Sequence, residues 1–164
     1  MTGQMILNLL GMLRLRSGPQ DMPSGWPLAI AMSFAYIAQG FFADRILGDT
    51  DGASRTLLAV GVQFMVIAIL LNVRNFSSRL PQTLIALAGT GFIFGLLSLA
   101  ILTRVDPTRS QPDLALIYLG LFGWSLVVDA HIYRQALSFK MGIGVLLAVL
   151  IFGANFVLLK AVFG

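Results

Sequence analysis

The sequence predicts an all-α integral membrane protein with five transmembrane helices, preceded by a short N-terminal interfacial amphipathic helix. Two observations carry this prediction: the composition is too apolar for a soluble domain, and five long runs are nearly free of charge. Of the 164 residues, 57% are hydrophobic and only 11% are charged, against roughly 25% charged in a typical soluble chain. Such a chain lacks the charged shell that a soluble protein of this size needs.

The five runs define the expected spans. A transmembrane helix needs about 20 predominantly apolar residues, and the sequence meets this requirement at about 27–43, 56–73, 81–103, 113–133 and 141–163. Because the bilayer core offers no water to the backbone, each span is expected to be a helix. Residues 22–164 should therefore form one five-helix transmembrane bundle, in which the fourth span is the least certain because Asp129 interrupts it.

Prolines mark the beginnings of three spans. Pro27, Pro81 and Pro112 stand where a first helical turn is expected, and at that position the missing N–H of proline costs nothing. A serine precedes each of these prolines by two or three residues, and serine favours the N-cap of a helix. These signals are independent of hydropathy and support the same spans.

Residues 1–21 are expected to form a cytoplasmic interfacial amphipathic segment. Its apolar run, Met5 to Leu15, is too short to cross a bilayer, and Arg14 and Arg16 stand at the end of the run instead of before it as in a signal peptide. A short amphipathic helix lying in the membrane interface fits this pattern. The segment either packs against its own bundle or senses lipid, and the sequence leaves both open.

The charges predict an orientation. The N-terminal segment together with loops 74–79 and 134–140 carries six Lys and Arg. Loops 44–55 and 104–113 together with the C-terminus carry five, along with five of the seven Asp. Because Lys and Arg collect on the cytoplasmic side, we expect the N-terminus in the cytoplasm and the C-terminus outside, in the inner membrane of a bacterium.

Several function classes find no support in the composition. The chain has no Cys, no Glu and a single histidine, His131, whereas metal sites normally need several such ligands. No G-x-S-x-G motif accompanies the histidine, and no phosphate-binding loop is present. We therefore expect no metal and no cofactor. The basic residues occur singly, so the net charge of +4 indicates membrane topology and not nucleic-acid binding.

The fourth span carries the candidate functional residues, which are Tyr118, Ser125, Asp129, His131, Tyr133 and Arg134. Four of them recur at helical spacing and form one polar stripe. Asp129 is the only acid inside a span, and ionisable residues inside a membrane are functional candidates by default. It either anchors the bundle through an ion pair with Arg74, Arg79, Arg134 or Lys140, or lies on a path for protons or solutes.

The third span has a face of small residues. Ala88, Gly91, Gly95 and Ser98 follow one another at helical spacing and allow another helix to approach closely. The partner is either a helix of the same bundle or a helix of another subunit. Gln39, Gln63 and Asn155, one each in three other spans, could meet in the core as interhelical hydrogen-bonding groups.

The layout from Trp26 to Gly164 resembles that of the Yip-type membrane proteins, which have a cytoplasmic N-terminal segment, five closely spaced spans and almost no C-terminal tail. The resemblance covers the architecture and not local motifs. It implies a role like that of the eukaryotic members, which are associated with membrane traffic and small GTPases.

From these observations we expect a non-enzymatic protein that acts as a scaffold, assembly factor or interaction partner for other membrane proteins or lipid. Its expected partners are the lipid bilayer and either another membrane protein or a second copy of the chain. The alternative is a small transporter or channel subunit that uses the polar stripe. A third reading, an intramembrane enzyme acting on lipid, requires Asp129 and His131 to converge with nearby arginines.

Overall fold

The computed structural model describes residues 2–48, 51–106 and 108–164, and its regular elements there are all helical. Five helices are long and apolar enough to cross a membrane, which confirms the predicted fold class. They are α2 (Trp26–Leu47), α3 (Gly52–Val73), α4 (Leu80–Leu102), α5 (Pro112–Leu137) and α6 (Met141–Phe163). The shorter elements are the N-terminal helix α1 (Thr2–Leu13) and the 3₁₀ turns η1 (Pro19–Asp21) and η2 (Ser77–Arg79).

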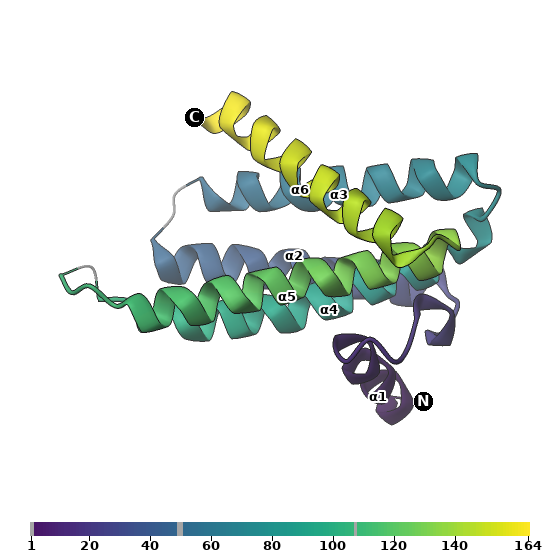
Figure 1. Cartoon of the computed structure of the whole chain (residues 1–164), viewed down its shortest axis with the longest axis horizontal. Helices are drawn as coiled ribbons and strands as arrows, with labels where there is room; N and C mark the ends of the chain where they lie inside the picture. The colour runs from purple at the N-terminus through teal and green to yellow at the C-terminus, as the bar shows by residue number, and fades with distance from the viewer. Residues whose placement is uncertain (1, 49–50, 107) are drawn as a thin grey trace.

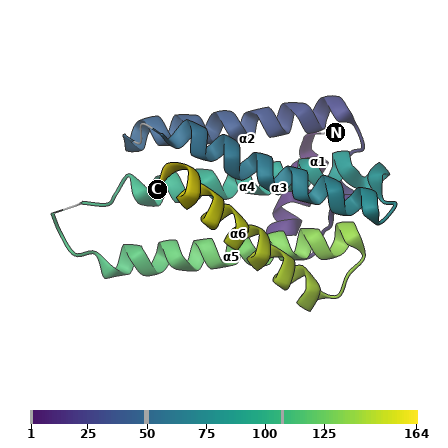
Figure 2. The ribbon, with the colours of Figure 1, turned by 90° about the horizontal axis from the view of Figure 1, so that it is seen from above.

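The five long helices form a closed ring. Going round the ring, α2 packs on α4, α4 on α5, α5 on α6, α6 on α3, and α3 on α2. In Figure 1, α3 and α6 lie above α2, α4 and α5, and α6 crosses α5 and α3 obliquely. The turns α3–α4 and α5–α6 lie at one end of the bundle, called here the α3–α4 end. The α2–α3 and α4–α5 connections lie at the other, the α2–α3 end (Figure 2).

The helices extend beyond the predicted spans where polar residues begin. The end of α2, the start of α3 and the end of α5 each lie four residues outside the predicted limit. Hydropathy stops a span at the first charge, but a helix can continue into the headgroup region, where water is available to polar side chains. α2 ends at Gly48, whose φ of 75° is the left-handed conformation that glycine adopts without strain.

The predicted helix starts are confirmed for the prolines and not for the serines. Pro27, Pro81 and Pro112 stand in the first turns of α2, α4 and α5. The N-cap positions of these helices are held by Gly25, Arg79 and Gln111, and none makes a side-chain capping bond.

The bundle is packed tightly at one end and loosely at the other. The buried residues of α4 and α6 lie mostly in their first halves, and those of α5 lie in its second half. All of these halves belong to the α3–α4 end. Towards the α2–α3 end, the first half of α5 is largely exposed. The core therefore sits near the α3–α4 end, and the other end leaves room between helices.

The N-terminal segment packs against the bundle. α1 crosses the bundle axis instead of running along it (Figure 2) and contacts α4 and α5. Met12 is fully buried, and Leu9 lies against Gly89, so that a Cβ on that glycine would come within 2.6 Å of a Leu9 methyl carbon. Among the two alternatives that the sequence left open, this geometry corresponds to packing against the chain's own bundle.

Side chains of α4 and α5 form hydrogen bonds with backbone carbonyls from the end of α1 to the start of α2. The Trp124 indole N–H donates to the carbonyl of Leu13 at 3.0 Å, and His131 Nε2 contacts the Ser17 carbonyl at 2.9 Å. Gln82 Nε2 donates to the carbonyl of Met22 at 2.9 Å. Unpaired backbone groups are costly in an apolar environment, so these bonds hold the segment in place.

Candidate functional site

A polar cluster lies inside the ring of helices and consists of Tyr36, Gln63, Asp129 and Tyr133. Gln63 Nε2 donates to the Tyr133 hydroxyl at 2.8 Å and to Asp129 Oδ2 at 3.3 Å. Tyr36 faces the carboxyl group from α2 and interacts with it electrostatically, without a hydrogen bond between them in the described structure. The cluster thus joins side chains from α2, α3 and α5 around one carboxyl group.

Gly91 of α4, the fourth helix around the cluster, leaves room for the Tyr36 side chain. A Cβ on Gly91 would lie 2.7 Å from Tyr36 Cζ, so the tyrosine ring occupies the space that any side chain at this position of α4 would fill. Tyr36, Gln63 and Gly91 all stand near the midpoints of their helices. The cluster therefore lies well inside the membrane-spanning part of the bundle.

Asp129 has no cationic partner among the described residues, contrary to the predicted ion pair. Its hydrogen bond is to Gln63. It lies eight residues before the end of α5, which is roughly 12 Å along a helix.

The arginines proposed as partners of Asp129 bind the end of α5 instead. Arg74 Nη2 donates to the carbonyl of Leu137 at 3.4 Å, and Arg79 Nη1 donates to that of Ala136 at 3.1 Å. Both guanidinium groups also lie over aromatic rings, including that of Phe76. The last carbonyls of a helix lack intrahelical donors, and arginine satisfies them here at the favourable pole of the helix dipole.

The predicted polar stripe of the fourth span is not continuous in the structure. Asp129 and Tyr133 belong to the cluster, but the Ser125 hydroxyl returns to the Phe122 carbonyl of its own helix at 2.7 Å. Tyr118 is 37% exposed and borders a separate small pocket near the start of α5. The residues of the stripe lie on one face of α5, but those near its start and those near its end contact different parts of the molecule.

His131 and Arg134 lie outside the cluster. His131 stands two positions after Asp129, which is about 200° around a helix, and it accordingly contacts the N-terminal segment. Because a carbonyl only accepts, its Nε2 carries the proton. Arg134 is half-buried, and a Cβ on Gly144 of α6 would lie 3.1 Å from its Cβ. The hypothesis of an intramembrane enzyme acting on lipid required Asp129 and His131 to converge, and in the structure they do not.

A cavity extends from Tyr36 towards the α2–α3 end, and its lining includes none of Gln63, Asp129 and Tyr133. It has a volume of about 250 Å³ and lies between α2, α3 and α4, with Tyr36 at one limit and Asp44 and Leu47 at the other. A water molecule occupies about 30 Å³, so the cavity has room for several. Asp129 and Gln63 are themselves only partly buried, whereas Tyr133 is 1% exposed.

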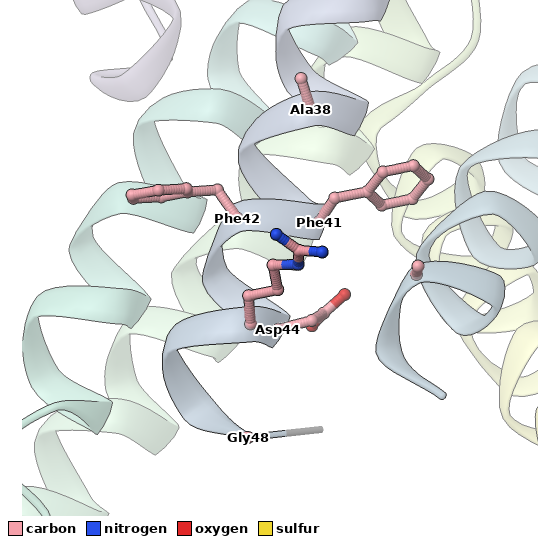
Figure 3. A pocket seen from close by; sticks show the side chains of 7 residues that line it. Ala38, Phe41, Phe42, Asp44 and Gly48 are labelled. Carbon is pink, nitrogen blue, oxygen red and sulfur yellow. The ribbon is translucent and has the colours of Figure 1, made fainter. Parts of the chain in front are cut away.

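A shallow hollow of about 730 Å³ adjoins this cavity at the end of α2. Figure 3 shows Phe41 and Phe42 pointing to opposite sides of the helix, with Asp44 further along it. Asp44 lines both the hollow and the cavity. Its carboxylate accepts a hydrogen bond of 3.0 Å from the Thr56 hydroxyl, which places a negative charge beside the first turn of α3.

The small-residue face of α4 meets α2 of the same bundle. Ala88 is fully buried, Gly91 lies under Tyr36, and a Cβ on Gly95 would collide with the Gln39 amide. Ser98 lines the cavity. These residues allow the two helices to approach closely, in the manner expected of small residues in membranes.

The three isolated polar residues do not meet. Gln63 belongs to the cluster, Gln39 lies against α4, and Asn155 Nδ2 donates to the Ala59 carbonyl at 3.3 Å. The Asn155 Oδ1 atom is buried without a partner among the described residues.

One member of the cluster was not predicted. Tyr36 counts as apolar in hydropathy sums, so it did not stand out from its span. The signal that could have identified it is its position: a hydroxyl-bearing residue near the midpoint of an apolar helix, three residues before Gln39.

Comparisons with protein-family models, with curated proteins and with solved structures find no match to this chain. The likeness to Yip-type proteins therefore stays an expectation from architecture. Among the described residues, no group of three or more acidic, His or Cys side chains is placed to hold a metal ion.

Proposed function

We propose that this integral membrane protein is a small transporter or channel subunit that conducts protons or a small monovalent cation, with Asp129 as the group that binds them. One observation carries the proposal. Asp129 lies inside the helix ring next to the Gln63 amide and the Tyr133 hydroxyl, and no Lys or Arg side chain among the described residues pairs with it. A carboxylate in a membrane interior is costly unless a proton or cation offsets its charge.

The chemistry of the cluster suits such a ligand. The Asp129 carboxylate and the Tyr133 hydroxyl supply oxygen atoms, which are the atoms that hard cations prefer, and the Gln63 amide nitrogen holds both groups by donating to them. The Tyr133 hydroxyl accepts from Gln63 and keeps its own proton for donation.

Access to the cluster supports the same proposal. The cavity between α2, α3 and α4 runs from Tyr36 to Asp44, and the adjoining hollow continues from Asp44 to the surface of α2. Ions would enter from the α2–α3 end, where the helices are loosely packed. The tightly packed α3–α4 end would have to open for a complete passage.

The test is proton flux into vesicles. Purified protein is reconstituted in vesicles that contain a pH-sensitive dye, and a potassium diffusion potential drives protons inward. We expect acidification above that of empty vesicles, its loss in Asp129→Asn, and its retention in Asp113→Asn, an exposed acid on the same helix. The same vesicles with sodium or potassium gradients distinguish a cation from a proton. Wild-type flux equal to empty vesicles, or to that of Asp129→Asn, would overturn the proposal.

A second measurement separates this role from a structural anchor. An asparagine at position 129 can still accept a hydrogen bond from Gln63, so we expect the melting temperature of Asp129→Asn to equal or exceed that of wild type. A fall of several degrees would instead assign Asp129 to the stability of the bundle.

We also propose the setting predicted from the charges, a bacterial inner membrane with the N-terminus in the cytoplasm. The scaffold role stays a prediction. Its support is the set of outward apolar side chains on the five helices, and lipid covers such faces in any membrane protein, so they favour no particular partner.

A further inference from the structure

A second pocket lies at the α3–α4 end and is formed by three distant parts of the chain. Its volume is about 250 Å³, and its polar lining comes from η1, the start of α4 and the end of α5: Gln20, Arg79, Gln82, Gln135 and Ser138. This pocket is separate from the polar cluster and from the cavity beside Tyr36.

The lining presents one cation and several neutral hydrogen-bonding groups, and it contains no acid. Arg79 is fixed in place because its Nη1 donates to the Ala136 carbonyl at 3.1 Å and to the Ser138 hydroxyl at 3.0 Å, and its guanidinium lies 4.1 Å from the centre of the Phe76 ring. Within the described part of the chain, its Nε and Nη2 make no hydrogen bond. Two donors of a held guanidinium thus remain for a ligand.

The surroundings favour an anion. The pocket adjoins both the positive N-terminal end of α4 and the C-terminal end of α5, and Arg79 already binds an end carbonyl of α5. Arg74, Arg134 and Lys140 lie on the same end of the bundle. The nearby acid is Asp21, an exposed residue whose carboxylate accepts from the Gly18 backbone N–H at 2.8 Å.

The geometry points to a site for a phosphate group, and we propose that the pocket binds one. Arginine presents planar, paired donors that match phosphate oxygens, and the amides of Gln20 and Gln135 can donate to the remaining oxygens, whereas Gln82 already donates to the Met22 carbonyl. Arg79 immediately precedes α4, so it lies where the bundle leaves the hydrocarbon and meets the headgroups. The phosphate is that of an anionic phospholipid or of a free phosphate ion, and the experiment separates these two sources.

The test is lipid retention by the whole purified protein in neutral detergent, measured by native mass spectrometry. We expect phosphatidylglycerol to be retained about tenfold more strongly than phosphatidylcholine, because both lipids carry the phosphate but the choline cation of the second offsets its charge and is repelled by Arg79. Arg79→Gln should abolish this preference. Arg104→Gln, an exposed arginine at the opposite end, should keep it.

Gln135→Leu keeps the proposal testable if Arg79→Gln loses its fold, because no hydrogen bond within the described chain depends on the Gln135 side chain. It should also reduce retention of phosphatidylglycerol. If excess inorganic phosphate displaces the lipid and binds alone in an Arg79-dependent manner, the ligand is the free ion; if it does not displace the lipid, the ligand is the headgroup. Equal lipid preference in wild type, Arg79→Gln and Gln135→Leu would overturn the proposal.

Discussion

Replacing Gly91 by alanine tests the geometry on which the polar cluster depends. The new Cβ would lie 2.7 Å from Tyr36 Cζ and 2.9 Å from Cε2, whereas carbon atoms pack best at about 3.5 to 4.0 Å. The tyrosine ring would have to move by several tenths of an ångström, away from α4. Adding a methyl group to a packed site of this kind costs about 1 to 3 kcal/mol.

Gly61→Ala is the matched control. Gly61 is exposed on α3, and a Cβ there meets nothing within 4 Å. Both substitutions gain the same helix propensity, about 1 kcal/mol, so the difference between the two variants isolates the contact with Tyr36. Gly95→Ala should fall between them, because the Gln39 amide that it meets is the end of a flexible side chain.

The assay is thermal unfolding in detergent, followed by circular dichroism. At about 2 to 4 °C per kcal/mol for a chain of this length, Gly91→Ala should melt roughly 2 to 12 °C below Gly61→Ala. Equal melting temperatures would refute the reasoning, since they would mean that Tyr36 does not rest on α4 and that the cluster is arranged differently.

Three further predictions concern other parts of the molecule. Because the chain has no cysteine, a single Cys at Thr108 should react with an impermeant thiol reagent in intact spheroplasts and one at Ser77 should not; the reverse pattern would invert the proposed orientation. Asn155→Leu removes a buried carbonyl oxygen that has no partner in the described chain and also the 3.3 Å bond from Nδ2 to the Ala59 carbonyl. Because that carbonyl lies inside α3 and keeps its intrahelical donor, the melting temperature should stay the same or rise by a few degrees, equivalent to about 1 kcal/mol, and a clear fall would contradict this. Trp124→Phe removes the hydrogen bond to the Leu13 carbonyl and should speed amide exchange in α1 by about tenfold while exchange in α4 is unchanged. Equal exchange in α1 of wild type and variant would show that this bond does not hold the segment.

The spans were predictable from sequence because burying charge in hydrocarbon is costly wherever the helix ends up. The order of helices around the ring was not predictable in this way. Helical periodicity told which residues share a face of α5, but it could not tell that α3 meets one half of that face. Gln63 therefore replaced an arginine as the partner of Asp129.

Two kinds of acceptor compete for Arg74 and Arg79, the Asp129 carboxylate and the last carbonyls of α5, and the sequence of one helix does not show which is nearer. Arg74 and Arg79 lie near the end of α5 only after the chain has folded, and there the unpaired carbonyls of Ala136 and Leu137 are closer to them than Asp129 is. Tyr36 was missed because its ring is apolar enough to count as lipid-facing, while its hydroxyl matters only in the folded ring.

The bonds that hold the N-terminal segment also set the time at which it can reach its place during synthesis. Trp124 and His131 lie 111 and 114 residues after the carbonyls that they bind. At about 5 to 20 residues per second, the ribosome needs roughly 6 to 23 seconds to make these partners. α1 can therefore take its final place only after α5 has been made. Its amphipathic character lets it wait on the membrane surface until then.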